Sequence, residues 1–142
     1  MADLYEDDVV AWSEQQAALL RARSANYLDW DNIAEEIADV AQRQKDQIDS
    51  RLAIACEHLL KWQFQPDHRS GSWRNSIVEA RNWIARMLQR IPSLQTDPAA
   101  VLADAYRDGR AKAAAETDPE NLPQSCPWTI EQVLDRDFWP ES

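Results

Sequence analysis

The sequence predicts an all-α protein, an antiparallel helical bundle of four main helices plus a short C-terminal helix. Its 142 residues include only two glycines, and alanine is abundant, which favours helices. No segment shows the alternation of β-branched and polar residues that is typical of strands. Six of the seven prolines lie between segments of helical periodicity, where they would separate one helix from the next.

The first helix is expected from about residue 7 to residue 23. Its first turn is acidic, and Arg21 and Arg23 lie at its end, so charges at both ends complement the helix dipole. The residues that should face inward are Val9, Trp12, Gln16 and Leu19 or Leu20.

The second helix should be the longest, from about residue 31 to residue 62, with Asp29 or Asp31 as its N-cap. Its apolar residues recur at helical spacing and predict one inward stripe. The stripe consists of Ile33, Ile37, Val40, Ile48, Ala55, Leu59 and Trp62.

The third helix is expected from about residue 73 to residue 91, with Ser70 or Ser72 as its N-cap. Its inward stripe consists of Trp73, Ile77, Ala80, Ile84, Leu88 and Ile91.

The fourth helix is expected from Pro98 to about residue 116, because Asp97 before a proline is a typical helix start. Gly109 lies on its inward face and predicts the close approach of another helix. Thr129 and Gln132 have the spacing of a capping box, which predicts a short last helix to about residue 136.

The length suits a single helical domain over residues 1–142. No apolar run is long enough for a membrane span, and the acidic N-terminus excludes a signal peptide. Two glycines leave no phosphate-binding loop and no dinucleotide-binding motif. Cys56 and Cys126 are interpreted as reduced thiols, so the expected location is the cytoplasm.

The formal net charge is −10, which argues against nucleic-acid binding. The charge is segregated: residues 1–60 hold 13 acidic and 5 basic side chains, and residues 97–142 hold 10 and 4. Residues 61–96 reverse this balance, with 2 acidic and 6 basic side chains. The basic segment is therefore expected to pair with the acidic flanks, inside the fold or across a subunit contact.

One row of polar residues shares the apolar face of the second helix. Gln44, Arg51 and His58 are seven residues apart, and Gln47 lies beside them. A buried guanidinium must be paired, so an internal hydrogen-bonded network that fixes helix register is one interpretation. The alternatives are a pocket for a small anion or a metal, and a row that tilts to the surface or covers a partner subunit.

Two further groups are candidate sites. Glu35, Glu36 and Asp39 could ligate a hard cation, but they also suit a solvated first turn that complements the helix dipole. Trp83, Arg86 and Arg90 lie off the apolar stripe of the third helix. Tryptophan and arginine together are typical of interface hot spots, so a protein partner, including a second copy, is weighed against internal packing and nucleic-acid stacking.

Several short stretches, taken in order, resemble the bacterial family catalogued as domain of unknown function 29. They are Leu4-Tyr5-Glu6, Ala18-Leu19-Leu20-Arg21, Asp31-Asn32-Ile33-Ala34-Glu35-Glu36-Ile37, His58-Leu59-Leu60-Lys61-Trp62-Gln63 and Cys126-Pro127-Trp128-Thr129-Ile130-Glu131-Gln132. The resemblance covers nearly the whole chain and implies a small, almost wholly helical protein. It implies no activity.

The sequence assigns no specific activity, no catalytic constellation, no metal site and no cofactor. The leading hypothesis is therefore a non-catalytic interaction or regulatory module that self-associates or binds another protein, without a membrane and without nucleic acid. The alternative is an enzyme, or a binder of a small ligand or metal, that uses the polar row around Arg51 and His58.

Overall fold

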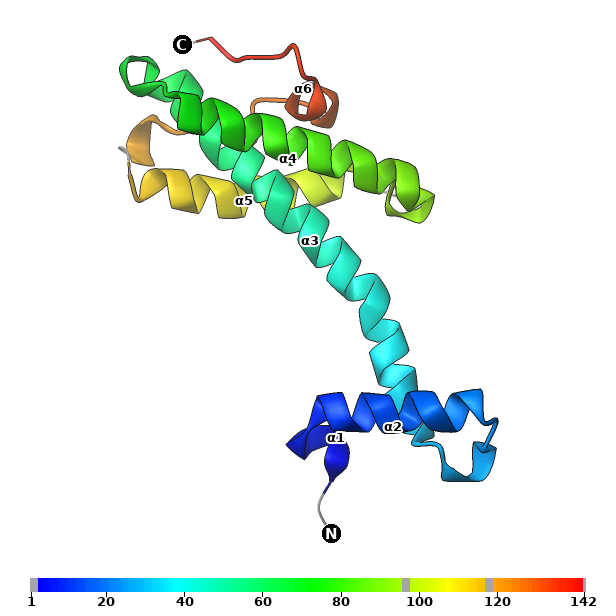
Figure 1. Ribbon diagram of the computed structural model, residues 1–142. Coiled ribbons are helices and arrows are strands. Elements are labelled where there is room, and N and C mark those ends of the chain that lie inside the picture. Colours follow the sequence, from blue (N-terminus) through cyan, green and yellow to red (C-terminus); the bar gives the residue numbers. More distant parts are fainter. Residues whose placement is uncertain (1–2, 96–97, 117–118, 142) are drawn as a thin grey trace. The chain divides into compact units, whose positions relative to one another are not determined.

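The computed structural model describes residues 3–95, 98–116 and 119–141, and it is all-α over these residues. Four long helices and shorter helical segments follow one another along the chain (Figure 1), which confirms the predicted fold class. The long helices are α2 (Val9–Arg21), α3 (Trp30–Phe64), α4 (Gly71–Arg90) and α5 (Pro98–Ala114). The short segments are α1 (Leu4–Asp7), η1 (Ala25–Tyr27), η2 (Pro66–His68), η3 (Pro92–Gln95), η4 (Pro119–Asn121) and α6 (Ile130–Leu134).

The chain divides into two compact units, residues 1–44 and residues 45–142, and helix α3 contributes to both. The expectation of one domain over the whole chain stays a prediction. Each unit is described by itself below.

The N-terminal unit packs α1 and α2 against the first turns of α3. Trp12 on α2 donates its indole N–H to the Asp29 carboxylate over 3.0 Å, and the Asp29 backbone N–H donates to the Gln16 side chain over 2.8 Å. The expected inward positions Trp12 and Gln16 are buried, whereas Val9 is half exposed. The first helix begins later than expected because Asp8 caps α2 through the Ala11 N–H, which separates α2 from α1.

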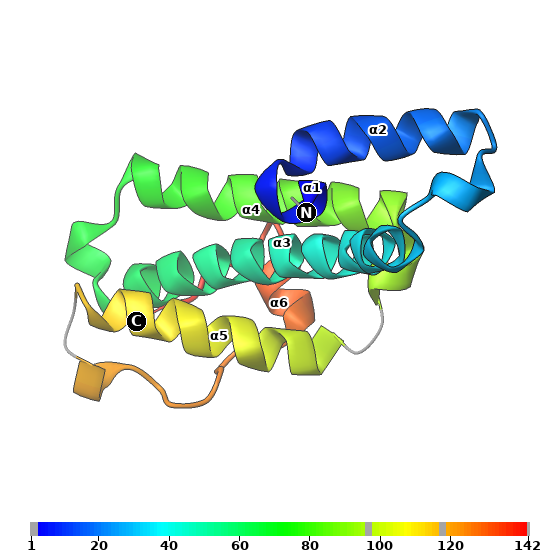
Figure 2. The same cartoon turned by 90° about the horizontal axis from the view of Figure 1, so that it is seen from below.

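The second unit is a bundle of the C-terminal part of α3 with α4, α5 and α6. Helix α4 runs antiparallel to α3 and α5 (Figure 2). Ser70 is the N-cap of α4 and Thr129 and Gln132 form the capping box of α6, as the sequence predicts. Asp97 lies outside the described residues. The buried core includes Ile48, Leu52, Cys56 and Leu59 of α3, Ile77, Ala80 and Ile84 of α4, Leu102, Ala105 and Tyr106 of α5, and Val133 of α6.

Gly109 sits where α5 crosses α3 most closely, which confirms the expected close approach. A Cβ atom at this position would lie 2.6 Å from the Ala53 carbonyl oxygen and 2.9 Å from the Cys56 Cβ. Only a residue without a side chain allows α5 to lie this near to α3.

The C-terminal segment is held to the bundle through its backbone carbonyls. The Tyr106 hydroxyl and the Arg110 guanidinium both donate to the Pro123 carbonyl. Arg81 of α4 is 1% exposed, and it donates to the carbonyls of Val133 over 2.7 Å and Phe138 over 2.8 Å. These bonds fix α6 and the residues after it.

Candidate functional site

The side chains of the polar row of α3 are only partly buried. Gln44, Arg51 and His58 are half-buried, whereas Gln47 is exposed, so a continuous internal network is not formed. The Gln44 side-chain oxygen is buried and has no hydrogen-bond partner among the described residues. The helical period places these residues on one face correctly, but the helices that pack against α3 do not cover the whole of it.

Arg51 contacts the aromatic candidate of the neighbouring helix. Its guanidinium carbon lies 5.0 Å from the ring centroid of Trp83, within the range of cation–π attraction. Two shallow depressions flank this pair. The first, about 480 Å³, is lined by Asp46, Gln47, Ser50, Arg51 and Trp83. The second, about 300 Å³, is lined by Arg51, Glu79, Asn82, Trp83 and Arg86.

The structure therefore joins residues that the sequence placed in two separate groups. Gln47 and Arg51 of the polar row meet Trp83 and Arg86 of the interface candidate. His58 lines neither depression, and its Nδ1 lies 2.9 Å from the Ile54 carbonyl oxygen. Arg90 is exposed in the last turn of α4 and also lines neither depression. Neither of these two depressions brings Arg51 and His58 together.

Lys61 is a buried charge that sequence reasoning missed. Its ammonium group lies 3.3 Å from the Glu57 carboxylate, also pairs with Glu116, and sits 5.6 Å from the Trp73 ring centroid. The pairing lowers the pKa of Glu116. The sequence did contain a signal for this position, because Lys61 lies three residues after His58 and therefore on the same helix face as the polar row. Lys61 thus pairs with the acidic flanks as expected, whereas Arg69, Arg74 and Arg81 contact carbonyl groups or indole rings.

Of the three candidate carboxylates, Glu36 is engaged and the other two are exposed. The Glu36 carboxylate accepts the Tyr5 hydroxyl over 2.7 Å and the Arg43 guanidinium over 2.7 Å. These bonds lower the pKa of Glu36, and the hydrogen bond to Glu36 raises the pKa of Tyr5 to about 12. Glu35 and Asp39 lie in solvent. Within the part of the chain that the structure describes, no three His, Cys, Asp or Glu side chains gather as a metal site.

The first turns of α3 carry an apolar face that nothing in the described N-terminal unit covers. Ile37 is 67% exposed and Val40 is 55% exposed, so the prediction that this part of the stripe points inward is wrong. The periodicity shows that one face is apolar, but it does not show what packs on that face. Other large apolar side chains of this unit are also exposed: Val9, Val10, Leu20, Tyr27 and Trp30.

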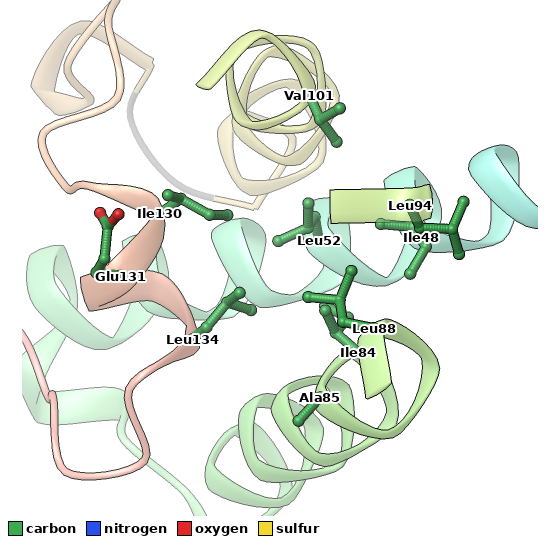
Figure 3. A pocket seen from close by; sticks show the side chains of 10 residues that line it. All are labelled: Ile48, Leu52, Ile84, Ala85, Leu88, Leu94, Val101, Ile130, Glu131 and Leu134. Atoms are coloured by element: carbon green, nitrogen blue, oxygen red, sulfur yellow. The ribbon is translucent and has the colours of Figure 1, made fainter. Parts of the chain in front are cut away.

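A second apolar feature lies within the bundle. A recess of about 410 Å³ opens among α3, α4, η3, α5 and α6 (Figure 3). Its lining is Ile48, Leu52, Ile84, Ala85, Leu88, Leu94, Val101, Ile130, Glu131 and Leu134. The sequence could not reveal it, because the lining comes from five elements whose placement depends on the tertiary fold.

Comparison with known proteins gives one finding and two absences. A model of the family described as Domain of unknown function DUF29 matches residues 4–139. No curated protein and no solved structure matches the chain. Among the described residues, no helix combines the length and the hydropathy that crossing a bilayer requires. The family match covers almost the entire sequence and confirms the resemblance, so the chain belongs to the family Domain of unknown function DUF29.

Proposed function

We propose that this protein is a non-catalytic interaction module that self-associates through the exposed apolar face of α3. The observation that carries the proposal is the exposure of Ile37 and Val40, two large aliphatic side chains one turn apart. Apolar side chains clustered in water are unfavourable, and such clusters are typical of protein–protein contacts.

The shape of this face suits a second copy of the same helix. Large residues alternate with small ones: Ile33, Ile37 and Val40 are interleaved with Ala34, Ala38 and Ala41. In a helix, residues 34, 37, 38 and 41 form the four corners of one hole, into which a side chain of a facing helix can insert. Because both copies present the same ridges and holes, the face can complement itself about a twofold axis.

Charge does not prevent two copies from meeting at this face. Residues 1–44 hold ten acidic and three basic side chains, so this unit would repel its copy if its carboxylates met. Between residues 33 and 41, however, Glu35 and Asp39 lie about 160° around the helix from Ile37. Glu36 lies at the flank of the face, about 100° from Ile37, and its charge is already paired with Arg43. Two such faces can therefore approach without bringing like charges together.

The small core of the N-terminal unit supports the same proposal. Trp12 and Gln16 are its only buried side chains among the described residues. Units of this size bury little of their surface and are commonly stabilised by oligomerisation. Covering Ile37 and Val40 would give this unit a larger apolar core. The free thiols Cys56 and Cys126 support action in the cytoplasm as part of this proposal.

The test is the mass of the protein in solution, measured by light scattering during size-exclusion chromatography. The wild type should elute at micromolar concentration as a species of at least twice the 16.3 kDa chain mass. Ile37→Lys removes about 1.5–3 kcal/mol of apolar burial from each copy, so the dissociation constant should rise at least about a hundredfold.

The matched control is Val78→Lys on α4. Val78 is also an exposed aliphatic residue of a helix, but it lies outside the apolar face of α3, so this variant should keep the wild-type mass. Far-ultraviolet circular dichroism should show equal helix content in both variants. A wild type that has the mass of one chain at all concentrations tested would overturn the proposal, as would equal dissociation of both variants.

A further inference from the structure

The aliphatic recess of the bundle differs from the shallow depressions around Arg51. Of the ten described residues that line it, nine are Ile, Leu, Val or Ala, and the tenth is Glu131. The two depressions beside Arg51 instead contain charged groups of both signs. A volume of about 410 Å³ falls in the range of small-ligand sites.

The lining restricts the shape of an occupant. Ile84, Leu52 and Ile48 form its buried floor, and Leu88, Leu134 and Val101 are half-buried around it. Among the described residues no aromatic ring lines the recess, so they offer no flat surface on which a planar molecule could stack. Flexible aliphatic side chains from several elements fit a flexible aliphatic chain.

Glu131 restricts the charge of the occupant. It also borders a neighbouring recess of about 440 Å³, so it lies where the two recesses adjoin. Figure 3 shows Ile130 and Leu134 turned toward the side chains of α3 and α4, with Glu131 apart from them at the edge of the group. In the part of the chain that the structure describes, no basic side chain lines either recess. A carboxylate at this edge attracts a cation and repels an anion.

We propose that this recess binds the aliphatic chain of an alkylammonium compound and that Glu131 pairs with its ammonium group. The chain leaves water for a lining that offers no competing hydrogen bonds, while the cation stays at the solvated edge. This site is independent of the self-association proposed for α3, because its residues and its chemistry are different.

The first experiment is isothermal titration calorimetry of the full-length protein with n-alkylammonium chlorides of six to ten carbons. Each methylene that enters the recess should tighten binding about fourfold, until the recess is full and the affinity levels off. The n-alkanoate of equal length should bind about tenfold more weakly than the n-alkylammonium ion, because Glu131 attracts the ammonium group and repels the carboxylate. In Glu131→Gln this tenfold preference should disappear while the dependence on chain length remains.

The second experiment blocks the recess without removing a core side chain. Ala85 lines the recess and is exposed on α4, so Ala85→Phe should fill it and weaken octylammonium binding at least tenfold. Ala111→Phe on α5 is the control, since Ala111 is also an exposed helical alanine but does not line the recess. Should Ala85→Phe fail to fold, methyl resonances of Leu88 and Val101 that shift on titration of the wild type, with those of Leu59 unchanged, give the same information.

Three results would overturn the proposal. They are equal or tighter binding of the alkanoate, an affinity that does not change with chain length, and equal binding by Ala85→Phe and the wild type. The mass measured by light scattering reports on the α3 face alone, so failure of either proposal can be distinguished from failure of the other.

Discussion

Replacing Gly109 by alanine should destabilise the protein even though alanine is the better helix former. The new Cβ would lie 2.6 Å from the Ala53 carbonyl oxygen and 2.9 Å from both the Cys56 Cβ and the Glu57 backbone nitrogen. Two of these neighbours are backbone atoms of α3, so no flexible side chain can move aside and α5 must shift. Overpacking of this kind costs about 1–3 kcal/mol, whereas helix propensity returns about 0.5–1 kcal/mol. The expected net loss is about 1–2 kcal/mol.

Gly71 provides a matched comparison because nothing lies within 4 Å of the Cβ that it would gain. Gly71→Ala at the first residue of α4 should therefore stabilise the protein by about 0.4–1 kcal/mol, chiefly by restricting the unfolded chain. Urea unfolding monitored by circular dichroism measures both variants, with the midpoint shifting and the slope unchanged. If Gly109→Ala unfolds at the same or a higher urea concentration than the wild type, the inferred closeness of α5 to α3 is incorrect.

Two other predictions concern single side chains. Arg81→Ala should lower the free energy of unfolding by at least about 3 kcal/mol, because it leaves the carbonyls of Val133 and Phe138 without their charged donor. Arg81→Lys should recover only part of this stability, since lysine lacks the planar fork, and urea unfolding of both variants tests the ranking. The hydrogen bond to Glu36 raises the pKa of Tyr5 from 10.0 to about 12. The stability that this hydrogen bond contributes is therefore complete below pH 10 and is lost as the pH rises toward 12. Spectrophotometric titration of tyrosinate should show that Tyr5→Phe loses one high-pH component, and an unchanged titration curve would refute this assignment.

Features that depend on neighbouring residues in the sequence were predictable. Ser70 caps α4, and Thr129 with Gln132 forms the capping box of α6, because capping uses groups only three residues apart. The close approach at Gly109 was also predictable. Glycine weakens a helix, so its presence on an inward face is best explained by a neighbouring helix that comes too close for a side chain.

Features that depend on a second element were not predictable in the same way. The period of α3 placed Ile37 on an apolar face, but only the tertiary structure shows that this face is open to solvent. Arg51 was placed in an inward row, yet its contact is Trp83 on another helix, about thirty residues away in the sequence. The recess bordered by Glu131 needs five elements in position before it exists.

The contacts of Arg81 also imply an order of events during synthesis. Its acceptors belong to residues 132–138, which leave the ribosome more than fifty residues after it. While α4 is already outside the exit tunnel, its guanidinium has only water as a partner, and burying it then would be costly. The bundle can therefore close around this arginine only after residues 132–138 have also left the tunnel, which makes their emergence the step that commits the bundle to the native state.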